Sequence, residues 1–383
     1  MDKRLIIKIL IILVPLELLL WYHVFNNSEG TSDNNLEEIS DIRYYGKDFF
    51  LLEGTEIADS LKESRYDRLP LSLKNVVREP VWNLSKSSAG MSIRFLSNTT
   101  AINVKWTVLN DNKMPHMPES GIKGVDLYFN NNGKFQYLNT AIPSGIESEF
   151  LLMQNMSNEM REYKMFLPLY DGLVSIEIGI DSDSQILKAD KNMAKPIIFY
   201  GTSITQGCCA SRPGMAHTNI ISRKLNVDVI NFGFSGNGMM ESPINELISE
   251  SDPLLYVIEC LPNMSSEQVT ERTIPLVKTI REKHSKTPII LVENFIYDRS
   301  VLDMKDDEMI TKKNKALRDE YIKLINSGYD YVYYVEGANA NGDDYEGTND
   351  TVHFNDLGYM RYADYLICLL YTSDAADEGL GVD

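Results

Sequence analysis

One stretch of the chain, residues 197–207, decides the fold and reads IIFYGTSITQG. It begins with four apolar residues, Ile197–Tyr200, and changes at Gly201 into a turn of small and polar residues. A short, continuously apolar run is typical of a strand that is buried on both faces of a parallel sheet. The turn behind it predicts the point at which this strand ends and a helix begins.

Four further apolar runs follow, and segments with helical periodicity lie between them. We expect strands at Ile197–Tyr200, Val227–Phe232, Leu254–Cys260, Ile289–Glu293 and Tyr331–Val335, and helices at Ala216–Leu225, Glu267–His284 and Met309–Ile325. Buried strands that alternate with amphipathic helices predict an α/β domain, in which helices cover both faces of a parallel sheet. We assign this domain to residues 194–370.

The residues in front of this domain follow a different pattern. Across residues 39–190, short stretches of alternating apolar residues lie between turns that are rich in Asn, Gly and Pro. Clear examples are Met91–Phe95, Ala101–Val108, Gly124–Phe129 and Leu173–Ile180. Many short strands without a long helix predict an all-β sandwich or jelly roll. A chain of 383 residues exceeds one typical core, which agrees with two folded domains.

The two ends of the chain are set apart from both domains. Residues 1–25 begin with basic residues and contain the apolar run Ile9–Leu20, which predicts a signal peptide or a retained membrane anchor. Residues 26–38 are polar, as in a linker. Residues 371–383 are small and acidic, look non-native, and are left out of the fold prediction. We therefore expect an exported protein that is periplasmic, secreted or anchored on the outer side of a membrane.

Composition and short motifs limit the classes of partner and cofactor that we expect for this chain. The net charge of −18 argues against nucleic-acid binding, because contacts with phosphates need clustered Lys and Arg. The four cysteines, Cys208, Cys209, Cys260 and Cys368, are too few and too irregularly spaced to predict a disulfide scaffold or a zinc site. Neither GxxxxGKS/T nor HExxH occurs, and no GxGxxG follows the first strand. We expect no metal and no cofactor, and the oligomeric state stays open.

Polar and small residues follow four of the predicted strands. Gly201–Gly207 follows the first strand, Gly233–Gly238 the second and Leu261–Met264 the third, and Asp350–His353 comes after the fifth. Ligands of open parallel sheets bind beyond the carboxyl ends of the strands, which lie along one edge. We therefore expect these four segments to converge on a single site.

The converging residues match what acyl transfer needs. The Ser203 hydroxyl becomes a nucleophile when a base takes its proton, and His353 can be that base. Asp350 lies three residues before His353 and can accept its Nδ1–H, which fixes the ring. The backbone N–H groups of Ser203 and Gly236 and the side-chain amide of Asn263 can hold the oxyanion. These residues predict a serine esterase with the triad Ser203, His353 and Asp350.

The four segments resemble the signature blocks of the SGNH (GDSL-type) hydrolases, which carry serine, glycine, asparagine and Asp-x-x-His in this order. Gly124–Tyr128 resembles the GxDLY signature of the β-rich domain that precedes the catalytic domain in one carbohydrate-esterase-like subgroup. Block one reads Gly-Thr-Ser here instead of Gly-Asp-Ser, and block three reads Leu-Pro-Asn-Met instead of Gly-x-Asn-Asp. The resemblance implies a flavodoxin-like parallel sheet behind a jelly-roll domain.

Several alternatives remain open on sequence alone. Ser203 could simply cap the helix that follows the turn, and Asp350 and His353 could be a surface pair. His116 could line the site from the front domain. The resemblance implies hydrolysis of small acyl esters, acetyl foremost, through an acyl-serine intermediate, with a carbohydrate as the expected carrier. A lipase that acts on longer acyl esters and a non-catalytic glycan-binding protein are the competing hypotheses.

Overall fold

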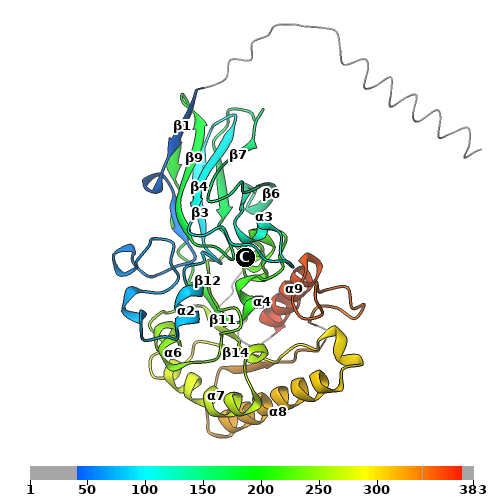
Figure 1. Ribbon diagram of the computed structural model, residues 1–383. Coiled ribbons are helices and arrows are strands. Elements are labelled where there is room, and N and C mark those ends of the chain that lie inside the picture. Colours follow the sequence, from blue (N-terminus) through cyan, green and yellow to red (C-terminus); the bar gives the residue numbers. More distant parts are fainter. Residues whose placement is uncertain (1–40, 339, 373–383) are drawn as a thin grey trace, which may run out of the picture. The chain divides into compact units, whose positions relative to one another are not determined.

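The computed structural model of the protein describes residues 41–338 and 340–372 (Figure 1). The predicted signal or anchor segment 1–25 and the predicted linker 26–38 lie outside these residues, as does 373–383. Among the helices of the described residues, none combines the length and the apolar character that a membrane crossing requires.

The front part of the described chain is a sandwich of two antiparallel sheets. One sheet has the order β1-β9-β4-β7, with bounds Ile42–Tyr45, Leu173–Asp181, Ile102–Val108 and Glu147–Met153. The other has the order β10-β3-β8-β5-β6, with bounds Ile186–Lys188, Ser92–Ser97, Arg161–Phe166, Val125–Asn131 and Lys134–Ala141, and β2 (Leu51–Glu53) pairs with β3. Both sheets contribute to one apolar core, in which Phe95, Trp106 and Ile178 are buried. The predicted all-β sandwich is confirmed, and its helices α2 (Glu79–Leu84) and α3 (Glu119–Ile122) are short.

The back part contains a five-stranded parallel sheet with the order β12-β11-β13-β14-β15. The strands have the bounds β11 Ile197–Gly201, β12 Val229–Gly233, β13 Leu255–Glu259, β14 Ile289–Val292 and β15 Val332–Val335. Counted along the chain, this order is 2-1-3-4-5, which is the flavodoxin-like arrangement. Every residue of β11, β12, β13 and β14 is buried, as continuous apolar runs predict.

Helices cover both faces of this sheet, which confirms the predicted α/β class. Their bounds are α4 Ser203–Gln206, α5 His217–Leu225, α6 Ser242–Ser249, α7 Ser266–Arg281, α8 Met304–Asn326 and α9 Asp356–Thr372. Helices α5 and α9 pack on the face that carries Phe199, and α6 and α7 pack on the face that carries Tyr200. The sequence patterns did not predict α6 or α9. Helix α9 runs two residues into segment 371–383, which had been left out of the prediction.

Buried polar contacts join the front sandwich to the loops at the carboxyl edge of the parallel sheet. The Arg68 guanidinium donates to the carbonyl oxygens of Asn231 at 3.1 Å and Gly233 at 2.6 Å, at the end of β12. Asp126, from the Gly124–Tyr128 signature, accepts hydrogen bonds from the Arg212 side chain and from the Gly214 N–H, both at 2.7 Å. Unpaired buried charges are costly, so these contacts fix how the front domain meets the loops that surround the site.

Candidate active site

The turn after β11 presents Ser203 at the first position of helix α4. Thr202 is the N-cap of this helix: its side chain accepts the Ile204 N–H, and Thr205 Oγ1 accepts the Thr202 N–H at 3.1 Å. Thr202, and not Ser203, is thus the cap of this helix, and the capping box leaves the Ser203 N–H unused. The alternative in which Ser203 serves only as a helix cap is therefore wrong, and its hydroxyl is available for other contacts.

The Ser203 hydroxyl faces the imidazole of His353, which comes from the loop in front of α9. Ser203 Oγ lies 3.0 Å from His353 Nε2, and His353 Nδ1 lies 2.8 Å from Asp350 Oδ2. The second oxygen of Asp350 accepts the backbone N–H of His353 at 2.7 Å. Asp350 thus holds both the ring and the backbone of His353, and a proton can pass from the serine hydroxyl to the imidazole.

The charge of Asp350 suits this arrangement. Burial alone would raise the pKa of Asp350, but the hydrogen bonds from the backbone and ring of His353 lower it below its usual value. Asp350 is therefore a carboxylate at neutral pH and can accept the proton on Nδ1. The imidazole is then in the tautomer whose Nε2 accepts a proton from Ser203.

The second and third predicted segments lie next to the first. The Phe234 N–H donates to the Gly201 carbonyl at 3.0 Å, and the Gly238 N–H donates to Asn263 Oδ1 at 3.3 Å. This contact engages the amide oxygen of Asn263, so the NH₂ group is the end that can donate to a ligand. Gly236 has a φ of +67°, and a Cβ there would meet nothing within 4 Å, so its backbone borders open space. All four predicted segments therefore meet at the carboxyl edge of the sheet.

A second carboxylate–imidazole pair lies next to the turn that carries Ser203, and the sequence did not predict it. Glu259, the last residue of β13, accepts a hydrogen bond from Thr205 Oγ1 at 2.6 Å and lies 3.2 Å from His217 Nε2. The Tyr362 hydroxyl donates to its other oxygen at 2.7 Å. Burial alone would raise the pKa of Glu259, but His217 and the hydrogen bonds from Thr205 and Tyr362 lower it below its usual value. Thr205 completes the capping box around Thr202, and Glu259 holds the Thr205 hydroxyl in place, so Glu259 stabilises the turn that carries Ser203.

The sequence gives only a weak signal for this pair. Residues 217, 259 and 362 lie far apart in the chain and on three different elements, so no local spacing connects them. The only available sign was a single acidic residue, Glu259, inside the apolar run Leu254–Cys260. A charged residue in a buried strand is costly unless it is paired, which would have predicted a partner but not its identity.

His116 and two cysteines complete the surroundings of His353. The rings of His116 and His353 have centroids 5.8 Å apart, so the front domain does line the site. Cys208 Sγ lies 3.5 Å from His116 Nε2 and 3.4 Å from Cys209 Sγ. The hydrogen bond with Cys209 and burial raise the pKa of the Cys208 thiol, so Cys208 is a protonated thiol at neutral pH.

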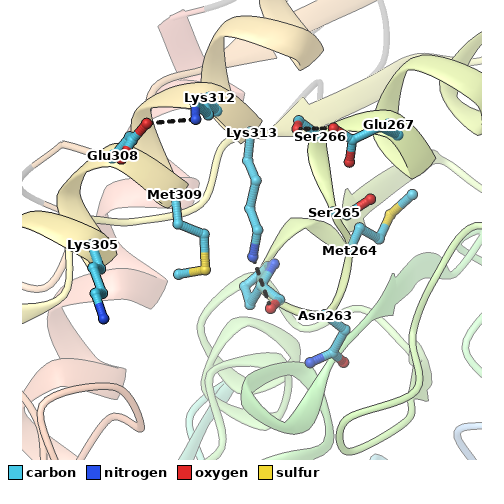
Figure 2. Close-up of a pocket in the computed structure, with 11 residues that line it drawn as sticks. Asn263, Met264, Ser265, Ser266, Glu267, Lys305, Glu308, Met309, Lys312 and Lys313 are labelled. Carbon is cyan, nitrogen blue, oxygen red and sulfur yellow. Dashed lines mark hydrogen bonds and ion pairs between the residues drawn. The ribbon is translucent and has the colours of Figure 1, made fainter.

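A hollow of about 540 Å³ adjoins Asn263 (Figure 2). Its lining combines polar and apolar side chains: Ser265, Ser266 and Glu267 from the start of α7, Lys305, Glu308, Lys312 and Lys313 from α8, and the apolar Pro262, Met264 and Met309. Lys313 Nζ donates to the Pro262 carbonyl at 3.3 Å. Figure 2 shows Lys312 paired with Glu308 on α8. Hydroxyl-rich molecules can hydrogen-bond to the polar part of this lining.

Comparisons with known proteins agree with this architecture. The model of the GDSL-like lipase/acylhydrolase family matches residues 194–370, and the model of the N-terminus of SGNH-hydrolase-type esterases, called GxDLY, matches residues 44–186. A solved GDSL-like lipase from Bacteroides ovatus ATCC 8483 is similar at 34% identity and a TM-score of 0.82, covering 86% of this chain and 97% of its own. No curated protein matches the chain.

Two more distant structures share the fold alone. A salicylyl-acyltransferase from a tetracycline biosynthetic pathway is 16% identical with a TM-score of 0.70, and the match covers 86% of this chain and 98% of the other. A family two carbohydrate esterase from Clostridium thermocellum, solved in complex with cellohexaose, is 14% identical with a TM-score of 0.55, and the match covers 74% and 92% of the two chains.

Proposed function

This chain belongs to the GDSL-like lipase/acylhydrolase family and is an ester hydrolase, and from that premise we propose that it removes small acyl groups, acetyl foremost, from a carbohydrate. The observation that carries the proposal is the hydrogen-bonded line from Ser203 Oγ through His353 to Asp350, with distances of 3.0 and 2.8 Å. In this proposal Ser203 is the nucleophile, His353 the general base and acid, and Asp350 the group that orients His353.

The proposed reaction has two steps. Ser203 Oγ attacks the ester carbonyl carbon while its proton moves to His353 Nε2, and the carbonyl electron pair moves onto oxygen. The N–H groups of Ser203 and Gly236 and the Asn263 amide hold that oxyanion. The intermediate collapses, the alcohol leaves with the proton from His353, and an acyl-serine remains. Water then attacks the acyl carbon and gives a proton to His353, which returns it to Ser203 as the carboxylic acid departs.

The polar side chains in the hollow beside Asn263 support a carbohydrate as the alcohol part of the ester. Its Ser, Lys and Glu side chains can hydrogen-bond to sugar hydroxyls, and specific polar groups of this kind orient a ligand in a pocket. The Clostridium thermocellum carbohydrate esterase, with which the chain shares its fold, was solved with cellohexaose, and this likeness agrees with a glycan substrate.

We further propose that the reaction takes place outside the cytoplasm, because residues 1–25 have the basic start and apolar run of a signal peptide or anchor. We expect a C-terminally tagged full-length chain to be recovered from the medium, from the periplasm or from the membrane fraction. If it is in the membrane fraction, protease added outside the cells should digest it. Recovery in the protease-protected cytosol would contradict export and leave the esterase proposal unaffected.

Hydrolysis of p-nitrophenyl acetate tests the role of Ser203. We expect Ser203→Ala to lower kcat by about 10⁴- to 10⁶-fold, because the nucleophile is lost while the fold is kept. Ser327→Ala, which changes an exposed serine at the end of α8, is the matched control and should retain wild-type kcat. Equal activity of Ser203→Ala and wild type would refute the assignment.

The substrate class needs its own measurement. We expect mass spectrometry to show that acetylated oligosaccharides lose acetyl groups. We also expect kcat/KM for acetyl esters to exceed kcat/KM for octanoyl esters by about tenfold or more, because a single methylene group in a pocket can change kcat/KM by about tenfold. Faster cleavage of octanoyl and longer esters would favour a lipid substrate instead. Binding of acetylated glycans without any ester cleavage would identify a glycan-binding protein.

A further inference from the structure

Four side chains next to the proposed nucleophile present metal-binding atoms to one another. His116, Cys208, Cys209 and His353 each offer one ligand atom, and the four atoms lie within 4.8 Å of one another. The Cys208–Cys209 sulfur distance is 3.4 Å, and Cys208 Sγ lies 3.5 Å from His116 Nε2. A tetrahedral zinc ion, with bonds of about 2.3 Å to sulfur and about 2.0–2.1 Å to nitrogen, spaces its ligand atoms about 3.4–3.8 Å apart. The cluster therefore has nearly the dimensions of a zinc site.

An unusual backbone conformation accompanies the convergence of the two adjacent thiols. Cys209 has a φ of +73°, in the left-handed region that residues other than glycine seldom adopt. The sulfur atoms of Cys208 and Cys209 lie side by side there instead of pointing apart. Local strain of this kind persists where the surrounding structure enforces it, and it concentrates at functional sites.

Neighbouring groups hold the cluster together. The Asn349 amide donates to the carbonyl oxygens of His116 at 3.4 Å and Cys209 at 3.5 Å, and thus links the two segments. The Tyr359 hydroxyl donates to the Cys208 carbonyl at 2.8 Å. The thiols are 1% and 3% exposed, whereas both imidazoles are partly exposed, so an ion can enter from the imidazole side. Metal ligands are usually oriented by such outer contacts.

We propose that His116, Cys208, Cys209 and His353 bind one Zn²⁺ ion and that the bound ion switches the hydrolase off. Thiolate and imidazole are the ligands that Zn²⁺ prefers. On binding, the two thiols release their protons to solvent, and the two thiolates balance the two positive charges of the ion. With four protein ligands, the ion has no open position for water, so the site is inhibitory and not catalytic.

Inhibition follows from the double use of His353 and rests on the proposed function. His353 Nε2 contacts Ser203, and its Nδ1 contacts Asp350. A metal on Nε2 leaves Ser203 without a base, and a metal on Nδ1 removes the contact through which Asp350 sets the tautomer. Hydrolysis therefore stops whichever nitrogen binds the ion, and it resumes when the ion is removed.

Metal binding can be measured without any ester. Ser203→Ala keeps all four ligands, and we expect it to bind one equivalent of Cd²⁺, a spectroscopic substitute for Zn²⁺, with a thiolate-to-metal charge-transfer band under reducing conditions. The same protein with Cys208→Ser and Cys209→Ser added should lose the band and bind at least tenfold more weakly. Cys368→Ser, which changes an exposed thiol, should keep both. If the double-cysteine variant does not fold, His116→Ala tests the site from the front domain. Absence of binding, or binding that survives these changes, would overturn the proposal.

Inhibition is then measured with wild-type protein and p-nitrophenyl acetate. One equivalent of Zn²⁺ should lower the rate at least tenfold, EDTA should restore it, and Cys209→Ser should be active and insensitive to the same Zn²⁺ concentration. Stoichiometric binding with an unchanged rate would overturn the inhibitory role. If metal-free wild type hydrolyses no ester, the proposed function fails, while the Cd²⁺ titration of Ser203→Ala still decides whether the metal site exists.

Discussion

Two carboxylate–imidazole pairs lie next to the turn that carries Ser203, and they differ mainly in their surroundings. In the pair at the rim of the site, the side chains of Asp350 and His353 are 38% and 23% exposed. In the pair that contacts Thr205, the side chains of Glu259 and His217 are 7% and 0% exposed. The rim pair contacts the Ser203 hydroxyl, and the buried pair contacts the Thr205 hydroxyl through Glu259.

This comparison shows that a carboxylate beside an imidazole does not by itself identify a catalytic group. The pKa of Asp350 and that of Glu259 are both lowered, so the direction of the shift does not separate the pairs. Access to solvent separates the two pairs, because a substrate and water can reach His353 but not His217. We infer that the rim pair moves protons and that the buried pair supports the turn, and the first two of the following changes test this division.

The largest effect is expected at the rim. Asp350→Asn should lower kcat by about 10³- to 10⁴-fold, because the amide no longer selects the tautomer of His353 that accepts the proton of Ser203. The free energy of unfolding should change by about 1 kcal/mol or less, since the pair lies at the rim and the Asp350 side chain is 38% exposed. The measurement is kcat for p-nitrophenyl acetate together with a urea unfolding curve. Asp364→Asn, which changes an exposed partner of Lys224, is the control. A near wild-type kcat for Asp350→Asn would remove Asp350 from the mechanism.

A smaller effect, on stability instead of activity, is expected for the buried pair of Glu259 and His217. Glu259→Gln should lower the free energy of unfolding by about 3–5 kcal/mol at pH 7, because His217 loses its charged partner inside the domain. The lowered pKa of Glu259 means that its carboxylate stabilises the fold above the pKa of the unfolded chain, and that this contribution is lost as the pH falls through the folded value. The difference in free energy of unfolding between wild type and Glu259→Gln should therefore become smaller at acidic pH.

Urea unfolding at neutral and acidic pH measures this difference in free energy of unfolding. Glu308→Gln, which changes the exposed pair with Lys312, is the control and should have the free energy of unfolding of wild type. The folded fraction of Glu259→Gln should keep kcat within about tenfold of wild type, since Glu259 touches no reacting atom. A variant of wild-type stability that had lost its activity would contradict the division between the pairs.

The smallest effect concerns Asp228, a carboxyl group without an imidazole partner. Burial and the charge of Glu53 raise its pKa to about 6, although the Gly54 N–H donates to it at 2.9 Å. A raised pKa favours the protonated form in the folded state, so the contribution of Asp228 to stability is present below the unfolded value and is lost as the pH rises through about 6. Asp228→Asn should remove this decline, which amounts to at most about 1.4 kcal/mol per pH unit. Parallel stability curves for wild type and variant between acidic and neutral pH would contradict the raised pKa.

The parts of the site that the sequence could predict are those with a local signal. Ser203, Gly236 and Asn263 each follow a buried strand, and Asp350 and His353 lie three residues apart, so strand ends and one short spacing were enough to locate them. The same apolar runs predicted the parallel sheet. Local patterns could not show that Thr202 caps α4, since serine and threonine are both common N-cap residues.

The supporting contacts could not be predicted because they join residues that are distant in the chain. Glu259 meets Thr205 across 54 positions, and Arg212 meets Asp126 across 86, and neither pair has a recurring spacing. The same holds for the cluster around Cys208, whose two histidines lie in the front domain and near the start of α9. Such contacts depend on the completed fold, whereas the segments that enter the triad are specified locally.

Covalent labelling of Ser203 tests the central claim most directly. A fluorophosphonate reacts when a serine oxygen attacks phosphorus, fluoride leaves, and the serine proton passes to the adjacent base. We predict one label per chain, located on Ser203 by peptide mass spectrometry, at a rate that falls by about 10³-fold or more in His353→Ala and little in Glu259→Gln. A label on another residue, or an unchanged rate in His353→Ala, would contradict the account.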